Sequence, residues 1–431
     1  MTKKEKRKLD TEIWQMLWPI VLLTLVQKLG SAFEGVLVSV NHAEELAIIS
    51  ICSPYITLIN TVSYGLGIAI NSMTGQLVGR GLWEKCHRRA VRFVMRLLLG
   101  AGFVMSVIAI LLLMQAFRSA PQLRPAGFLY MLPYLFGSPV MLLFNALISG
   151  MRGFKDSRTG MYMTCMIIPV QLFLSWFFYT SFGLPALGYG MLLARTAGCV
   201  YGVCHYKRKF MPENTGDGSL PEGFAGDFLR LAVPVSLSKM IGPAAHTLLN
   251  GLLLSIGSVY VGVNGLGGRL EGFFYLPAMA MGSVAITLTA QHKEDGDTTA
   301  LIRRLCVWSV TPTLFMIILA GSLAGPAWSM LTPDEALRAA GVEYWRICLP
   351  AYLFIALEMT ITGILQARGC GMPALVITLI RLWCIQLPAA WLSVRYGFGA
   401  SGIWMGFLLS NIVSLAVSVC WLMIKRKGER S

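Results

Sequence analysis

Four polar side chains share one face of the first long apolar stretch of the chain. They are Thr24, Gln27, Ser31 and Glu34, which step by three, four and three residues, and on a helix such positions lie above one another. A carboxylate at membrane depth is costly unless it is neutralised, paired or hydrated. We therefore predict that Glu34 is an ion-coupling acid, assisted by Gln27 and Ser31. A structural acid paired with Lys28 or with a base on another helix is the alternative.

Polar residues at helical spacing recur on three further apolar stretches. Asn60 and Tyr64 lie on the second, Asn145 on the fourth and Gln171 on the fifth. Facing Glu34, these side chains could line a hydrated cavity and help to hold H⁺ or Na⁺. Hydrogen bonding between helices is the alternative role for each of them.

The second half of the chain offers two more acids in apolar surroundings, Glu271 and Glu358. Tyr275 follows Glu271 at helical spacing. We predict that these three residues are candidates for the substrate cavity, where the acids could meet a cationic ligand. Pairing of either acid with a base on an adjacent helix is the alternative, and the candidate bases are Lys239, Arg269, Arg346 and Arg381.

The composition shows what kind of scaffold must position these residues. Of 431 residues, 55% are hydrophobic and only 13% are charged, and the mean hydropathy is +0.64. A soluble domain is less apolar than this, so we predict a polytopic membrane protein. The formal charge of +15 is spread over short pieces between apolar stretches, which favours orientation in a membrane over nucleic-acid binding. The ten cysteines form no CxxC pair, and apart from a Na⁺ ion near Glu34 we expect no metal site.

Twelve apolar stretches are long enough to cross a bilayer, which takes roughly 20 residues in a helix. Several exceed this length, which permits a tilt or a kink. The predicted spans are residues 13–40, 45–78, 92–117, 126–150, 160–182, 185–206, 228–255, 259–290, 302–330, 343–367, 373–396 and 400–424.

Basic residues gather in every second connection between these spans. The positive-inside rule then places both termini in the cytoplasm of a multi-pass protein of the cytoplasmic membrane. The basic groups are Lys3–Lys8, Arg80–Arg92, Arg152–Arg158, Lys207–Lys209, Lys293–Arg304 and Lys425–Lys427.

An internal repeat becomes visible when the second half is placed over the first at an offset of about 215 residues. Trp18-Pro19 then falls on Val233-Pro234, and Gln76 falls on Gln291. Two bundles of six transmembrane helices are implied, related by a pseudo-twofold axis along the membrane normal, with a substrate site between them. We predict an N-terminal lobe of residues 1–206, a cytoplasmic linker of residues 207–227 and a C-terminal lobe of residues 228–431.

Several motifs resemble those of the multidrug and toxic compound extrusion (MATE) family of cation antiporters. The similarity covers nearly the whole chain and recurs in both halves. The motifs are Trp18-Pro19 with Gln27 and an acid at 34, Thr74–Gly81, Arg152–Ser157, Arg269–Phe273 with Tyr275–Ala280, and Gly399–Trp404.

The resemblance implies two six-helix lobes and the export of small organic cations in exchange for H⁺ or Na⁺, without a cofactor. The chain departs from the family pattern at three points. Glu34 stands where the family usually has Asp, residues 292–296 differ from the usual Asn-x-Gly-Ala-Gly, and no acid occurs between Leu231 and Ser255. The last difference favours ion coupling in the first half.

Three classes of function were compared. An ion-coupled exporter of organic cations or drugs fits best, acting as a monomer in the bilayer. A flippase or exporter of a lipid-linked or amphipathic substrate is the alternative, although its cavity should be lined by arginines that hold phosphate, and here the bases are few. An enzyme is disfavoured, because the sequence has no HExxH, no GxSxG and no paired Asp motif with metal spacing.

Overall fold

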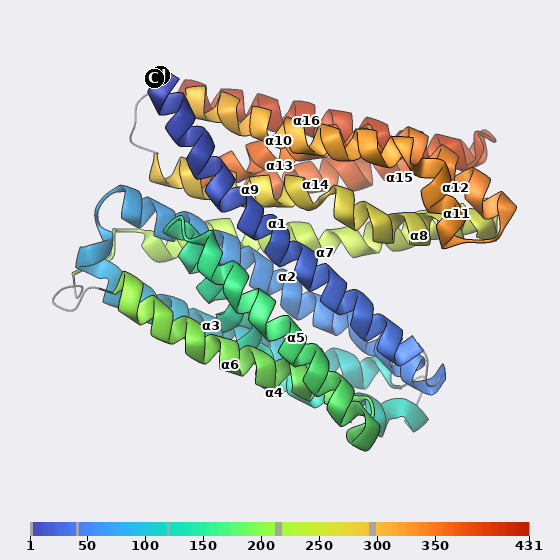
Figure 1. Ribbon diagram of the computed structural model, residues 1–431, viewed down its shortest axis with the longest axis horizontal. Coiled ribbons are helices and arrows are strands. Elements are labelled where there is room, and N and C mark those ends of the chain that lie inside the picture. The colour runs from blue at the N-terminus through green and yellow to red at the C-terminus, as the bar shows by residue number, and fades with distance from the viewer. Residues whose placement is uncertain (1–2, 40–42, 119–120, 212–217, 293–298, 431) are drawn as a thin grey trace. The chain divides into compact units, whose positions relative to one another are not determined.

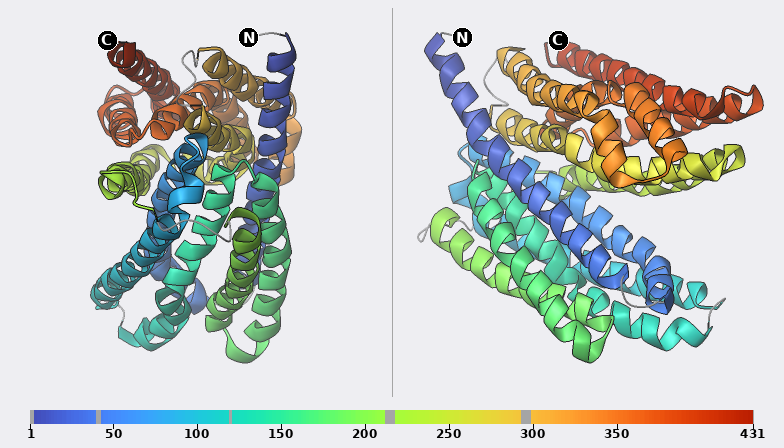
Figure 2. Two further views of the ribbon diagram at one scale, coloured as in Figure 1. Left: turned by 90° about the vertical axis from the view of Figure 1, so that its left-hand side faces the viewer. Right: turned by 45° about the vertical axis from the view of Figure 1, so that its right-hand side comes forward.

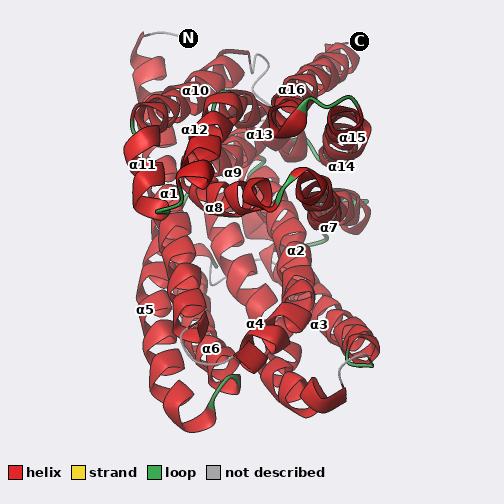
Figure 3. Cartoon of the chain, turned by 90° about the vertical axis from the view of Figure 1, so that its right-hand side faces the viewer, coloured by secondary structure: helices red, strands yellow, loops and turns green. Residues whose placement is uncertain are grey.

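The computed structural model of the protein describes residues 3–39, 43–118, 121–211, 218–292 and 299–430. Within these ranges, the side chains of residues 34–39 and of Arg269 are among those that are not described. All regular secondary structure in the described part of the chain is helical (Figures 1 and 3). This confirms the predicted all-α fold.

The first half of the chain forms long helices that follow the predicted spans. The first helix begins about ten residues earlier than predicted, because Lys, Arg, Glu and Leu of the basic head are good helix formers and extend it. A 3₁₀ turn, Pro121–Leu123, precedes the fourth helix. The helices are α1 (Lys3–Ser39), α2 (Ala43–Gly79), α3 (Trp83–Ala116), α4 (Arg124–Gly153), α5 (Ser157–Phe182) and α6 (Pro185–Phe210).

The second half divides into a larger number of shorter helices. A seven-residue π-helical segment, Ile380–Gln386, lies between α14 and α15. The helices are α7 (Phe224–Ile256), α8 (Ser258–Phe274), α9 (Leu276–Gln291), α10 (Thr299–Ser322), α11 (Ala324–Leu331), α12 (Glu335–Cys348), α13 (Ala351–Ala367), α14 (Met372–Leu379), α15 (Leu387–Arg395) and α16 (Gly399–Arg430).

The number of spans agrees with the prediction. Among the described residues, seven helical stretches are long and apolar enough to cross a membrane, and the bent pairs α8–α9 and α12–α13 raise this number to nine. The helices α2, α6 and α7 occupy the remaining three predicted spans. The plan of twelve spans is therefore confirmed.

The chain forms two compact units, and each is described by itself. The N-terminal unit is Trp18–Ser236, and the C-terminal unit is Met1–Leu17 together with Leu237–Ser431. In the N-terminal unit, α4 is the central helix and packs against α2, α3, α5 and α6 (Figures 1 and 2). In the C-terminal unit, α13 takes this place and packs against α9, α10, α12 and α16. Residues 212–217 of the predicted linker lie outside the described residues.

Two predicted spans of the second half contain a kink of the kind that the prediction allowed for spans longer than the minimum. The span over residues 259–290 bends by 46° between α8 and α9, and the span over residues 343–367 bends by 44° between α12 and α13. Pro277 lies in the first turn of α9, and Pro350 immediately precedes α13. Proline has no N–H to donate and its ring crowds the preceding turn, so each bend falls at a position where the helical ladder is already weakened.

Candidate ion-coupling and substrate site

Glu34 lies within α1, but its side chain is outside the described residues. The role of this acid, and the Na⁺ ion predicted beside it, therefore remain predictions. The described neighbours on the same stripe bond within their own helix. The Ser31 hydroxyl donates to the backbone oxygen of Gln27 at 2.9 Å, and the Thr24 hydroxyl donates to that of Ile20 at 2.7 Å. Gln27 is half-buried and Ser31 is exposed.

The other first-half candidates take different positions in the N-terminal unit. Asn60 and Tyr64 are exposed on α2, and Gln171 is buried on α5. Asn145 on α4 donates through Nδ2 to the hydroxyl oxygen of Ser63 on α2, at 2.8 Å. The structure therefore brings Asn145 to α2, where it links two helices.

Sequence reasoning missed an acid in the N-terminal unit. The hydroxyl of Tyr179 on α5 donates to Oε2 of Glu45, close to the start of α2. The two residues are 134 positions apart, so no local spacing could have paired them. Their bond joins α5 to α2 close to the ends of both helices.

The best-defined acid lies in the C-terminal unit. Glu271 on α8 accepts a hydrogen bond from the hydroxyl of Tyr344 on α12, and the side chain of Tyr352 on α13 lies close to the same carboxylate. Both tyrosines are only 4% exposed, and Cys348, also buried, lies between them in the sequence and close to Tyr344. We call these four residues the Glu271 cluster. Their spacing offers a signal that sequence analysis missed, because 344, 348 and 352 are successive positions of one helical face.

A glycine on α8 gives the tyrosine access to the acid. A Cβ atom at Gly267 would lie 2.4 Å from Cε1 of Tyr344, far inside van der Waals contact. Gly267 precedes Glu271 by four residues, so the two lie on the same face of α8. The missing side chain therefore makes room for the ring whose hydroxyl reaches the carboxylate.

The Glu271 cluster lies at both helix breaks of the C-terminal unit. Glu271 is one turn before the bend between α8 and α9, and Tyr344 and Tyr352 flank the bend between α12 and α13. Helices that are interrupted in the membrane are typical of transporter binding sites, because non-helical backbone is tolerated at that depth where it lines a cavity or is buried in protein. The aromatic surroundings add to this, since the rings of Tyr344 and Trp404 are 5.2 Å apart.

Among the described contacts, the side chains of Tyr275 and Glu358, the remaining candidates, do not bond to the Glu271 carboxylate, although the Tyr275 backbone N–H donates to the Glu271 backbone oxygen at 3.1 Å. Tyr275 is the half-buried residue between α8 and α9. Glu358 on α13 accepts from the hydroxyl of Thr362, one turn later, at 2.8 Å. Since Tyr352 and Glu358 are six residues apart, they point about 120° away from each other round the helix.

The candidate bases do not provide the described partners of Glu271. Arg381 donates to the side-chain oxygen of Asn411 at 3.3 Å, Arg346 is exposed, and the side chain of Arg269 lies outside the described residues. The Tyr344 hydroxyl is neutral, so its hydrogen bond stabilises a carboxylate without cancelling its charge. Such an acid can attract a cation or take up a proton. The described residues contain no group of three or more His, Cys, Asp or Glu side chains that could hold a metal ion.

A sequence model of the family MatE matches the chain twice, over residues 19–177 and 234–392. The chain belongs to the MatE family. The second match begins and ends 215 residues after the first, the offset that the alignment of Trp18-Pro19 with Val233-Pro234 indicates. Each half of the chain thus matches the MatE pattern by itself, which agrees with the internal repeat.

Individual relatives are distant in sequence and close in fold. The chain is 22% identical over 309 residues to "Probable multidrug resistance protein NorM" of Thermotoga maritima, an alignment that covers 68% of this chain and 65% of the relative, slightly less than two thirds. It is 21% identical to the protein of the same name from Oceanobacillus iheyensis, over 99% of both chains. A crystal structure of MATE in complex with MaL6 superposes with a TM-score of 0.90 at 20% identity, over 98% of both chains. At this identity the superposition shows the fold.

Proposed function

We propose that this MatE protein is a secondary active antiporter that exports small organic cations, drugs among them, in exchange for H⁺ or Na⁺ by alternating access. The observation that carries the proposal is the Glu271 cluster, a half-buried carboxylate that accepts a hydrogen bond from the neutral Tyr344 hydroxyl, with Tyr352 beside it, at two helix breaks. A lipophilic cation gains from a carboxylate and from aromatic faces together. The names of the two relatives support export of drugs, and the MatE pattern in both halves supports a transporter.

In this proposal, the first half binds the coupling ion and the second half contributes to the substrate cavity. Glu34 binds and releases the coupling ion in the first half, with Gln27, Ser31, Asn60, Tyr64, Asn145 and Gln171 as residues of its surroundings. Glu271, Tyr275 and Glu358 contribute to the substrate cavity from the second half. Both termini lie in the cytoplasm, as the distribution of basic residues indicates.

Inside-out vesicles test the coupling. A pH gradient and a Na⁺ gradient are imposed separately, with a fluorescent lipophilic cation as cargo, and the gradient that drives uptake identifies the ion. Glu34→Gln should abolish the ion-driven uptake, whereas Glu34→Asp should retain part of it, because only Asp keeps an ionisable group. Glu84→Gln on α3, an exposed acid, is the matched control and should transport normally. Uptake by Glu34→Gln at the rate of the control would rule out the proposed coupling acid.

A further inference from the structure

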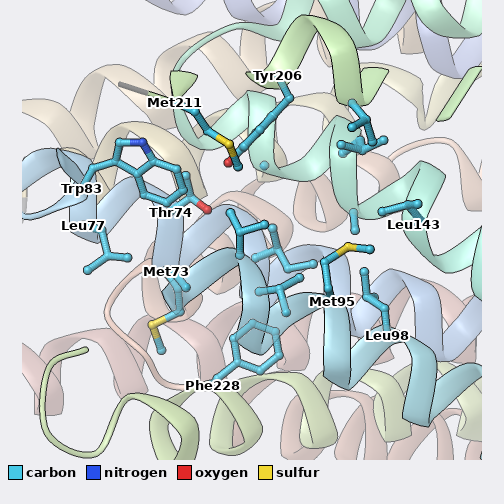
Figure 4. A pocket seen from close by; sticks show the side chains of 18 of the residues that line it. Met73, Thr74, Leu77, Trp83, Met95, Leu98, Leu143, Tyr206, Met211 and Phe228 are labelled. Carbon is cyan, nitrogen blue, oxygen red and sulfur yellow. The ribbon is translucent and has the colours of Figure 1, made fainter. Parts of the chain in front are cut away.

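An apolar cavity of about 290 Å³ lies within the N-terminal unit, between α2, α3, α4, α6 and the start of α7. Figure 4 shows Trp83 and Leu77 at one end of this cavity and Leu98 and Leu143 at the other. Along α3, the wall extends from Trp83 to Leu98, which is about 22 Å at the rise of an α-helix. The lining therefore extends over about four turns of α3.

The wall of the cavity is almost entirely hydrocarbon, thioether and aromatic. Thr74, Trp83, Tyr206 and Lys207 carry the polar side-chain atoms of the lining, the Trp83 N–H donates to the backbone oxygen of Phe210, and the lining contains no acid. Three methionines with flexible, polarizable side chains, Met73, Met95 and Met211, complete it (Figure 4). A wall of this kind suits an alkyl chain. The stretch of α3 in the wall is longer than the depth of one leaflet of the hydrocarbon core, which is roughly 15 Å.

One end of the cavity is strongly basic. Lys207 is exposed in the last turn of α6, and no carboxylate pairs with it among the described residues. The nearby Lys209 is already engaged, since its Nζ lies 2.6 Å from Oδ2 of Asp156. The first turns of α3, which also line the cavity, carry Glu84 as their acid and the bases Lys85, Arg88, Arg89 and Arg92.

The positive charge at this end of the cavity indicates which class of ligand binds there. The loop charges place this end of the unit in the cytoplasm, where the inner leaflet presents anionic headgroups, and basic pockets between transmembrane helices on that side bind them. A lipophilic cation would meet Lys207 and no compensating acid in the wall. The geometry points to a binding site for one anionic phospholipid, with an acyl chain in the cavity and its phosphate at Lys207.

The first test blocks the acyl chain. Val94 lines the cavity from α3, and Val94→Trp should fill it, whereas Val104→Trp places the same ring at an exposed position on the same helix. The full chain is purified in detergent containing equal amounts of phosphatidylglycerol and phosphatidylcholine, and bound lipid is counted by native mass spectrometry. We expect one phosphatidylglycerol on the native protein and on Val104→Trp, and at least a tenfold loss on Val94→Trp.

The second test removes the charge. Lys207→Gln should reduce the preference for phosphatidylglycerol over phosphatidylcholine about fivefold, the usual contribution of one base near an anionic surface. Arg208→Gln, an exposed neighbour outside the lining, should leave the preference unchanged. This second pair decides the question even if Val94→Trp does not fold.

Three results would overturn the inference. The first is undiminished lipid on a folded Val94→Trp protein, and the second is equal retention of both lipids by the native protein. The third is a cavity that takes up a fluorescent lipophilic cation, detected by loss of binding in Val94→Trp, while no lipid is retained. None of these measurements involves transport, so the site stands or falls independently of the antiport proposal.

Discussion

At the 215-residue offset of the two MatE matches, Glu271 of the second half corresponds to Ile56 of the first half, and Glu34 of the first half corresponds to Leu249 of the second. Ile56 and Leu249 both pack in the apolar cores of their units. The two halves therefore repeat the helices while placing their intramembrane acids at different positions.

The two halves also differ in whether the corresponding helices are continuous. In the first half, α2 and α4 each run as one helix, whereas their counterparts are broken into α8–α9 and α12–α13. Tyr275, at the first of these breaks, corresponds to Asn60 within the continuous α2. Both breaks adjoin the Glu271 cluster, so the second half departs from the repeat where its acid lies.

The largest effect is expected from removing the charge of Glu271, the acid of the second half that corresponds to an apolar residue in the first half. Glu271→Gln retains the shape of the side chain and removes its anion, so the binding of a fluorescent lipophilic cation to the purified protein should weaken about tenfold or more, as charged hydrogen bonds contribute about 1.5 to 3 kcal/mol. Fluorescence polarisation measures the dissociation constant.

Glu343→Gln is the matched control for this change. Glu343 is an exposed acid on α12 that accepts from the Ser401 hydroxyl at 2.6 Å. Its replacement should leave the dissociation constant unchanged. If both variants lose affinity equally, general charge rather than the Glu271 cluster explains cation binding, and the two halves do not differ in the way proposed.

A smaller effect is expected from two adjacent glycines of α8. Gly267→Ala drives a Cβ into the ring of Tyr344 and should destabilise the protein by about 1 to 3 kcal/mol, the usual cost of overpacking. Gly268 has nothing within 4 Å of the position of its Cβ, so Gly268→Ala should stabilise by roughly 0.5 to 1 kcal/mol through helix propensity. At the same offset the first half has Cys52, which is fully buried and carries its own Cβ.

Thermal unfolding followed by tryptophan fluorescence separates these outcomes. The midpoints of the two variants should move in opposite directions from that of the native protein. Equal shifts of the two midpoints would mean that the close approach of Tyr344 to α8 does not affect stability. Gly267 would then not be a feature that distinguishes the second half from the first.

The sequence was sufficient for the helices, the twelve spans and the presence of three intramembrane acids, because each depends on local hydropathy or residue type. It could not predict the partners of Glu271, since Tyr344 is 73 residues away and joins it only through the packing of α8 on α12. The positions of the prolines in the sequence did not predict the two helix breaks either. Pro54, Pro139 and Pro312 lie inside α2, α4 and α10 without ending them, so the outcome at Pro277 and Pro350 depends on what the neighbouring helices pack against.

The smallest effect concerns an acid outside the membrane spans that the repeat also fails to conserve. Asp156 caps α5, accepting from the backbone N–H of Thr159 at 3.1 Å, and pairs with Lys209 at 2.6 Å, whereas the matching stretch of the second half, Arg368–Met372, contains no acid. Burial alone would raise the pKa of Asp156, but the hydrogen bonds from Lys209 and Thr159 outweigh it and hold the pKa below its usual value.

A group with a lowered pKa stabilises the folded protein fully above the pKa of the unfolded chain, about 3.9, and loses this contribution as the pH falls through the folded value. Asn can still cap α5 through its side-chain oxygen, so Asp156→Asn should remove the pair with Lys209, about 0.5 to 1 kcal/mol for a partly exposed ion pair, together with the hydrogen bond that Oδ2 accepts from the Thr159 hydroxyl. The gap in unfolding midpoint between native protein and variant should be constant from pH 7 to 5 and narrow below about pH 4. In a Lys209→Gln background the gap at pH 7 should shrink, because the partner of Asp156 is gone. A gap that persists there would assign the effect to the cap of α5 rather than to the ion pair.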